Sequence, residues 1–205
     1  MPNLVQPAVS FRLGESIGSG AEPRFGLGCG GGSQTACGPS PLLRITELPA
    51  LLRALRGYCG MPQTQLGIRL LLLTGVRTGE LRWATPDQFD LDQALWIIPP
   101  EVVKQLQLEM RKEGKRSQDI PPYIVPLSVQ ALEVVRYLLQ QMRPAQRYLL
   151  SHRSDLGKRI SENTLNGALR RMGYADQLTG HGIRATLSTV LHEIGYPKVW
   201  VDHRG

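Results

Sequence analysis

Cysteine is scarce in this chain of 205 residues, which has only Cys29, Cys37 and Cys59. An odd number of widely spaced cysteines argues against a disulfide framework and is typical of a reducing compartment. Their spacing to the histidines matches no metal-ligand pattern, which argues against a zinc site. We therefore expect a cytoplasmic protein that holds no metal or other cofactor.

Long apolar runs are also missing. The four leucines from Leu70 to Leu73 are too few to span a bilayer. The first residues, MPNLVQPAVSFR, lack the basic start and sustained apolar stretch of a secretory signal. No close group of aspartates and glutamates indicates a magnesium-dependent nuclease. These absences exclude a membrane-spanning protein and argue against metal-dependent chemistry.

Positive charge is plentiful. The net charge is +7 and the pI is about 9.7, which favours an anionic partner, above all nucleic acid. Since many soluble domains are mildly basic, charge alone does not decide the function. The most basic region, between Arg143 and Arg171, has seven basic residues against Asp155 and Glu162.

The first 40 residues differ in composition from the rest. They are rich in glycine and their apolar residues follow no helical or strand period, so we expect residues 1–40 to form a disordered leader. Gly18-Ser19-Gly20 is not read as a phosphate loop, because Pro23 stands where a further glycine is required. Residues 41–205 are expected to form the folded domain.

Hydrophobic periodicity and turn residues predict an α+β fold that is mainly helical, with a small antiparallel sheet. The predicted helices cover residues 47–58 (capped by Thr46), 63–73, 78–84, 128–142, 161–172 and 181–195. The predicted strands cover 94–98 and 123–125, with a partly helical polar insert over 101–119 between them, and 148–150 is a buried strand or extended segment. In the last helix, Ile183, Leu187, Val190, Leu191 and Ile194 form the expected buried stripe.

Two sequence motifs indicate a phosphate-binding function. In LLLLTGVRTGELR (Leu70–Arg82), Arg77 stands between two glycines at the exit of a buried helix, where a guanidinium can clamp a phosphate. The alternative is a helix-end cap on carbonyl oxygens. In TGHGIRATLST (Thr179–Thr189), His181 and Arg184 project together from the first turn of a helix.

A helix amino terminus itself favours anions. Alone, His181 would be structural and Arg184 a surface or salt-bridge residue. Because both motifs occur in one chain, we predict that they build a single phosphodiester site.

These motifs resemble the catalytic domain of tyrosine recombinases, specifically the phage-type integrases of the P4-like group. The resemblance covers roughly Leu43 to Asp202. It is carried by LLLTGVRTGEL (Leu71–Leu81), WIIP (Trp96–Pro99) followed by Lys104, YIVPLS (Tyr123–Ser128) and TGHGIRATLST (Thr179–Thr189).

The resemblance implies a role for each candidate residue. Arg77, Arg184 and His181 would bind the scissile phosphate, and Lys104, with Lys115 as the alternative, would donate a proton to the leaving 5′ oxygen. A tyrosine would form a 3′-phosphotyrosine, so no ATP or metal is needed. The implied function is DNA integration and site-specific recombination for a mobile genetic element. The implied partner is double-stranded DNA, bound by a homo-oligomer, with no small-molecule substrate.

The sequence departs from the family pattern near its end. The family places a histidine or tryptophan box and then the nucleophilic tyrosine beyond the point reached at Gly205, and neither His203 nor Tyr196 matches these positions. We therefore expect a domain truncated before its nucleophile and inactive in strand cleavage as it stands. The alternatives are a non-catalytic DNA-binding remnant of an integrase, or a basic DNA- or RNA-binding module that never cleaved strands.

Overall fold

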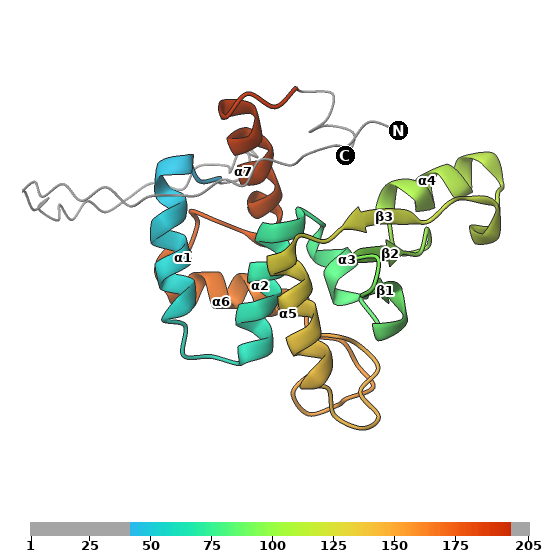
Figure 1. The fold of residues 1–205 in the computed structure, drawn as a ribbon, viewed down its shortest axis with the longest axis horizontal. Helices are drawn as coiled ribbons and strands as arrows, with labels where there is room; N and C mark the ends of the chain where they lie inside the picture. The colour runs from blue at the N-terminus through green and yellow to red at the C-terminus, as the bar shows by residue number, and fades with distance from the viewer. Residues whose placement is uncertain (1–41, 198–205) are drawn as a thin grey trace, which may run out of the picture. The chain divides into compact units, whose positions relative to one another are not determined.

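The computed structural model describes residues 42–197 (Figure 1), so the predicted leader over residues 1–40 lies outside the described residues. The α-helices are α1 (Leu48–Arg56), α2 (Pro62–Thr74), α3 (Thr78–Arg82), α4 (Lys104–Glu113), α5 (Val129–Gln140), α6 (Asn163–Leu169) and α7 (Gly180–Glu193). The strands are β1 (Phe89–Asp90), β2 (Leu95–Ile98) and β3 (Tyr123–Pro126). The predicted fold class, mainly helical with a small antiparallel sheet, is confirmed.

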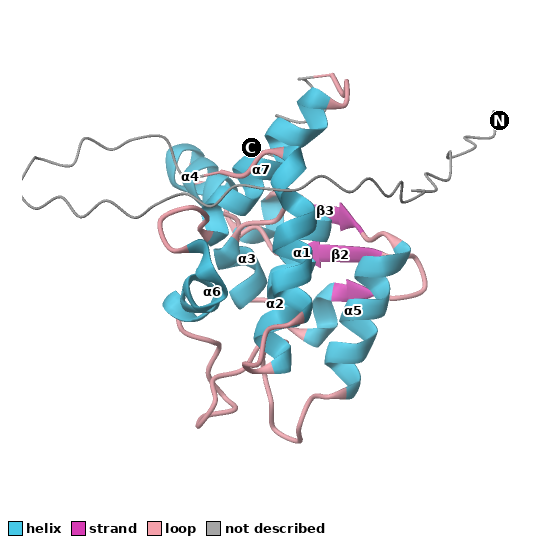
Figure 2. Ribbon diagram, turned by 90° about the vertical axis from the view of Figure 1, so that its left-hand side faces the viewer, coloured by secondary structure: helices cyan, strands magenta, loops and turns pink. Residues whose placement is uncertain are grey.

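Helix α2 is the centre of the packing (Figure 2). It contacts α1, α3, α5, α6 and α7, and Ile68, Leu70 and Leu71 are completely buried. Its second half is apolar on nearly every side, which is typical of a helix surrounded by others. Gly75 ends α2 in the left-handed conformation, with φ of 66°, and its N–H bonds to the Leu71 carbonyl.

The start of α1 differs from the prediction. Thr46 does not cap it; residues Ile45–Glu47 form a 3-10 turn first, and the Glu47 carboxylate accepts a hydrogen bond from the Arg44 N–H at 2.7 Å. A glutamate side chain that reaches back over three residues therefore caps the turn before α1, and no side chain caps α1 itself.

The sheet has the order β1-β2-β3 and is antiparallel throughout. Trp96 pairs with Val125 across β2 and β3, and its buried ring donates a hydrogen bond to Gln88 at 3.0 Å. The two-residue strand β1 was not predicted, because so short a strand is defined by its partner rather than by its own pattern. The polar insert between β2 and β3 contains α4, as expected.

The region around α5 and α6 follows the sequence with two differences. Ser128 caps α5 by accepting from the Ala131 N–H at 3.2 Å, as predicted. Residues 148–150 are buried but form no strand, and the neighbouring Ser151 and Arg159 make an isolated bridge. Helix α6 ends at Leu169 and continues as a π-helical turn over Arg170–Tyr174.

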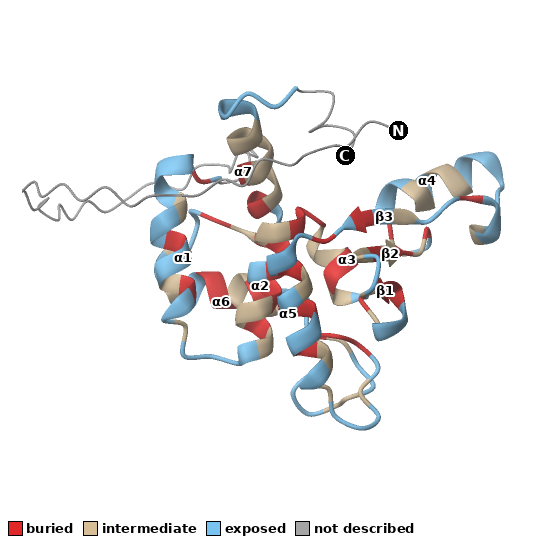
Figure 3. Cartoon of the chain, in the orientation of Figure 1, coloured by how far each residue is buried: buried red, intermediate tan, exposed pale blue. Residues whose placement is uncertain are grey.

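Helix α7 is buried only along its first part (Figure 3). Ile183 is 2% exposed, but Leu187 and Leu191 are half-buried and Ile194 is 55% exposed. The expected buried stripe is therefore wrong beyond Ile183. The reason is that α2, which packs against α7, ends at Thr74.

Among residues 42–197, no helix is both long and apolar enough to cross a membrane.

Candidate functional site

Arg77 lies between two helices, as the glycine-flanked motif predicted. It is the residue before α3 and follows Val76, which is 1% exposed and anchors the α2–α3 connection in the core. The Arg77 side chain is 24% exposed, so its guanidinium is held by the protein yet reaches the surface. Its described partner is a carboxylate rather than the helix-end carbonyls of the alternative interpretation.

That carboxylate belongs to Glu80, which the sequence argument did not single out. Glu80 is 1% exposed and accepts two hydrogen bonds from Arg77, one from the backbone N–H at 2.7 Å and one from Nη1 at 3.1 Å. The pair fixes the direction of the Arg77 side chain. The signal was present in the sequence, because a glutamate three residues after a helix-start residue has capping-box spacing.

Arg184 joins the second motif to the first. Its Nη1 donates a hydrogen bond of 2.7 Å to the carbonyl oxygen of Gly75, two residues before Arg77. A residue of α7 is thereby tied to the turn that presents Arg77, across a separation of 109 positions in the sequence. The two arginine motifs therefore meet in space.

A close backbone approach joins the starts of α3 and α7. A Cβ atom added to Gly180 would lie 2.3 Å from Cγ2 of Thr78, nearer than real side chains come. Asn166 of α6 accepts a hydrogen bond from the Gly180 N–H at 2.8 Å and holds this end of α7 in place. Only glycine permits this contact, which places the first turn of α7 next to the residue that follows Arg77.

His181 follows Gly180 directly and is exposed. Thr179 caps the helix by accepting from the Gly182 N–H at 2.9 Å, so α7 begins where the sequence predicted. The structure thus brings Arg77, His181 and Arg184 to one place, at the meeting point of the α2–α3 turn and the first turn of α7.

The two lysine candidates lie on the insert between β2 and β3. Lys104 is the exposed first residue of α4, and Lys115 follows Gly114 at the other end of that helix. Lys115 pairs with Glu113 at 2.5 Å, and this carboxylate raises the pKa of Lys115. In Figure 1, α4 lies well to the side of α7. The described contacts that join α3 to α7 involve neither lysine, so both assignments stay predictions.

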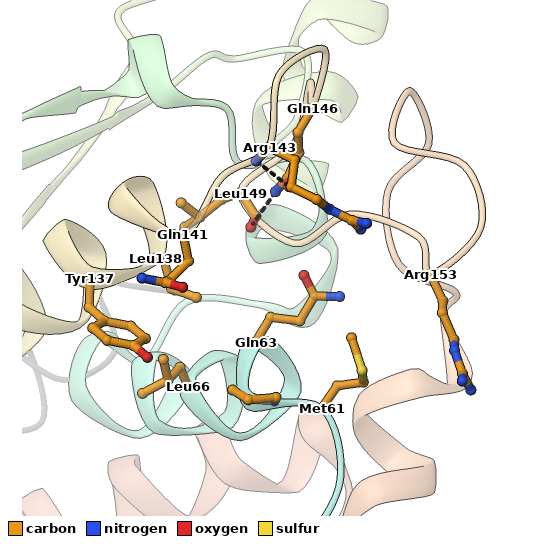
Figure 4. Close-up of a pocket in the computed structure, with 11 residues that line it drawn as sticks. Met61, Gln63, Leu66, Tyr137, Leu138, Gln141, Arg143, Gln146, Leu149 and Arg153 are labelled. Atoms are coloured by element: carbon orange, nitrogen blue, oxygen red, sulfur yellow. Dashed lines mark hydrogen bonds between the residues drawn. The ribbon is translucent and has the colours of Figure 1, made fainter.

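Two other kinds of site were considered within the described part of the chain, a metal site and a ligand pocket. Residues 42–197 contain no group of three or more His, Cys, Asp or Glu side chains placed to hold a metal ion. A pocket of about 480 Å³ opens between the amino end of α2 and the carboxyl end of α5 (Figure 4), with Gln63, Gln141 and Arg143 among its lining residues. Because Arg77 follows the opposite end of α2, this pocket is separate from the place where Arg77, His181 and Arg184 meet.

Comparison with known proteins shows the family to which the chain belongs. Residues 42–204 match the phage integrase family. The chain is 37% identical over 166 residues to the integrase of Enterobacteria phage P4, covering 79% of this chain and 36% of that protein. It is 34% identical to prophage integrase IntZ of Escherichia coli (strain K12), covering 80% of this chain and 37% of that one. The chain therefore spans little more than a third of the length of these relatives.

Solved structures share the fold. The Tn1549 transposon integrase, solved with circular intermediate DNA, superposes with a TM-score of 0.60 at 16% identity, over 82% of this chain and 59% of that one. The XerA recombinase gives a TM-score of 0.59 at 18% identity, over 84% of this chain and 56% of that one. These matches confirm the predicted tyrosine-recombinase catalytic-domain fold. With both arginine motifs inside the matched residues, the chain belongs to the phage integrase family of tyrosine recombinases.

Proposed function

We propose that this chain binds double-stranded DNA and holds one backbone phosphate between Arg77, His181 and Arg184, as the phosphate-binding part of a site for DNA integration and site-specific recombination. One observation carries the proposal. The Arg184–Gly75 hydrogen bond ties the helix bearing His181 to the turn bearing Arg77. Three donors from two distant motifs are thereby gathered at one point of the surface.

The chemistry of phosphoryl transfer suits this set of side chains. Negative charge on the non-bridging oxygens must be stabilised as the phosphorus is attacked, and fixed guanidinium groups supply that stabilisation. The amino end of α7 is the positive end of its helix dipole, so it also favours a bound phosphate. The Arg77–Glu80 pair holds one guanidinium in a fixed direction before the DNA arrives, which lowers the entropic cost of binding.

The remaining roles concern proton transfer and the nucleophile. In the intact reaction a tyrosine oxygen attacks phosphorus, the bond from phosphorus to O5′ breaks, and a proton passes to the leaving O5′. We assign Lys104 as the proton donor, with Lys115 as the alternative. We assign no described tyrosine to the attack. Structural relatives support DNA as the partner, since the XerH recombinase was solved bound to its difH substrate.

The phosphate site is tested by DNA affinity across a salt titration. We expect Arg77→Ala to weaken binding clearly more than Arg136→Ala, because Arg136 is an exposed arginine on α5. Each lost phosphate contact should also reduce the slope of log K against log[salt] by about 0.9. Equal losses in the two variants would contradict the proposal and favour a non-specific basic module.

Strand cleavage is tested separately by covalent trapping on nicked duplex DNA. A protein–DNA adduct that disappears in Arg77→Ala would assign cleavage to this chain. Specific binding without an adduct would limit its function to DNA binding, as in the remnant interpretation.

A further inference from the structure

A cationic pocket lies at the end of α3 opposite Arg77. It has a volume of about 370 Å³ and opens between Arg82 and the loop that connects α5 to α6. Besides Arg82, its polar lining includes His152, Lys158, Arg159 and Ser161. None of these residues belongs to the site formed by Arg77, His181 and Arg184.

Hydrogen bonds to backbone carbonyl oxygens hold the segments that form this pocket. Arg82 Nε donates to the Ile160 carbonyl at 3.2 Å, and the Leu149 N–H donates to the Ala84 carbonyl at 2.8 Å. Leu149 and Leu150 are buried, as is Ile160, which also lines the pocket. The cationic side chains therefore stand on a rigid support, which distinguishes the pocket from a mobile basic surface.

The two arginines of the pocket have little compensating charge, whereas Lys158 is paired with Asp155 at 3.0 Å. Glu162 lies 3.8 Å from Arg82 Nη1, but its side chain is 84% exposed whereas that of Arg82 is 15% exposed. Burial lowers the pKa of Arg82, and the nearby charge of Arg159 lowers it further against the opposing effect of Glu162. Two guanidinium groups are thus held close together with a single, solvated carboxylate beside them.

Arg159 brings a second guanidinium to the lining of the pocket. Its guanidinium carbon lies 3.8 Å from the centre of the Trp83 ring, a stacked arrangement that leaves the edge of the guanidinium available for hydrogen bonds. Its Nε is buried and has no acceptor among the described residues. This buried atom is closed to a ligand in the pocket, so the hydrogen bonds that Arg159 can offer there come from its two terminal nitrogens.

We propose that this pocket binds a phosphate group, with Arg82 and Arg159 as the principal donors and Lys158 at its rim. A phosphate offers several acceptor oxygens and matches the planar fork of arginine. The group could belong to DNA or be free phosphate. Arg77 and Arg82 stand at the two ends of α3, roughly 7.5 Å apart along its axis. Duplex DNA carries one charge per about 1.7 Å of its axis, so a duplex held at Arg77 offers further phosphates within that distance.

The test compares Arg159→Gln with Arg153→Gln in the full chain. Arg153 is an exposed arginine of the same loop that does not line the pocket, so both variants lose one charge from one segment. If the phosphate belongs to DNA, Arg159→Gln should weaken duplex binding about tenfold and lower the salt slope by about 0.9. Arg153→Gln should change binding by no more than about threefold, the effect of a general loss of charge.

Free phosphate gives a different result. Inorganic phosphate, replacing chloride at constant ionic strength, would then raise the melting temperature of the unaltered chain and of Arg153→Gln but not of Arg159→Gln, while duplex affinity stays equal in both variants. If neither assay separates Arg159→Gln from Arg153→Gln, the proposal is wrong.

A folding defect in Arg159→Gln would not leave the proposal undecided. Lys158→Gln removes a rim charge whose side chain is 77% exposed, so it should fold normally and show the same change in smaller measure. The outcome is also independent of the proposed function, which is judged by Arg77→Ala against Arg136→Ala. Phosphate binding at Arg159 can hold even if the Arg77 test fails.

Discussion

Replacing Gly180 by alanine should break the close contact between α3 and α7 on which the proposed phosphate site depends. The added Cβ would lie 2.3 Å from Thr78 Cγ2, where ordinary contact begins at about 3.4 Å. Overpacking of this kind costs about 1–3 kcal/mol, and the helix preference of alanine over glycine returns up to about 1 kcal/mol. We therefore expect Gly180→Ala to lower the free energy of unfolding by about 1–2 kcal/mol.

The cause can be isolated with a second substitution. Thr78→Ser removes Cγ2 and leaves Thr78 Cβ at 3.7 Å from the added atom, an ordinary contact. Thr78→Ser combined with Gly180→Ala should therefore regain most of the lost stability, with a coupling energy of about 1 kcal/mol or more. Gly79→Ala is the matched control on α3, because a Cβ there meets nothing within 4 Å; this variant should be neutral or slightly stabilised.

Urea unfolding followed by circular dichroism gives these free energies, and duplex affinity measured on the same samples shows whether His181 moves with the helix. The reasoning is refuted if Gly180→Ala is as stable as Gly79→Ala, or if the serine at position 78 restores nothing.

Three further outcomes are expected. Glu80→Gln should lower the unfolding free energy by about 1.5–3 kcal/mol, because an amide N–H then faces an Arg77 donor. The same variant should weaken duplex binding, although the chain becomes more positive. Tighter binding would show that Glu80 only competes with DNA for Arg77. Thr186→Val should cost about 1–3 kcal/mol in urea unfolding, since the Leu43 N–H loses its buried acceptor at 2.9 Å, whereas Thr186→Ser should keep that bond. Leu191→Ala should cost less than about 2 kcal/mol by thermal unfolding, below the range for a fully buried leucine, because this side chain is half-buried; a larger loss would mean that the exposed face of α7 is covered in solution.

Much of the fold was predictable because its signals are local. The run of leucines before Gly75 defined α2 and its end, since glycine alone adopts the left-handed conformation there at little cost. Ser128 defined the start of α5 through its side-chain cap. The errors arose where a neighbouring element decides the outcome. The burial of Leu187 and Ile194 depends on where α2 ends, and the short strand β1 depends on β2.

The candidate site also combines local features, which the sequence predicts, with long-range contacts, which it does not. By itself, the sequence determined which side chains are predicted to carry the chemistry, because Arg77 between two glycines and the His181/Arg184 pair are patterns of residue type and spacing. Only the tertiary structure decided that these motifs meet, through the Arg184–Gly75 hydrogen bond and the approach of Gly180 to Thr78. The physical reason is that a motif's spacing fixes geometry within about one helical turn, whereas the distance between residues a hundred positions apart depends on how complete helices pack.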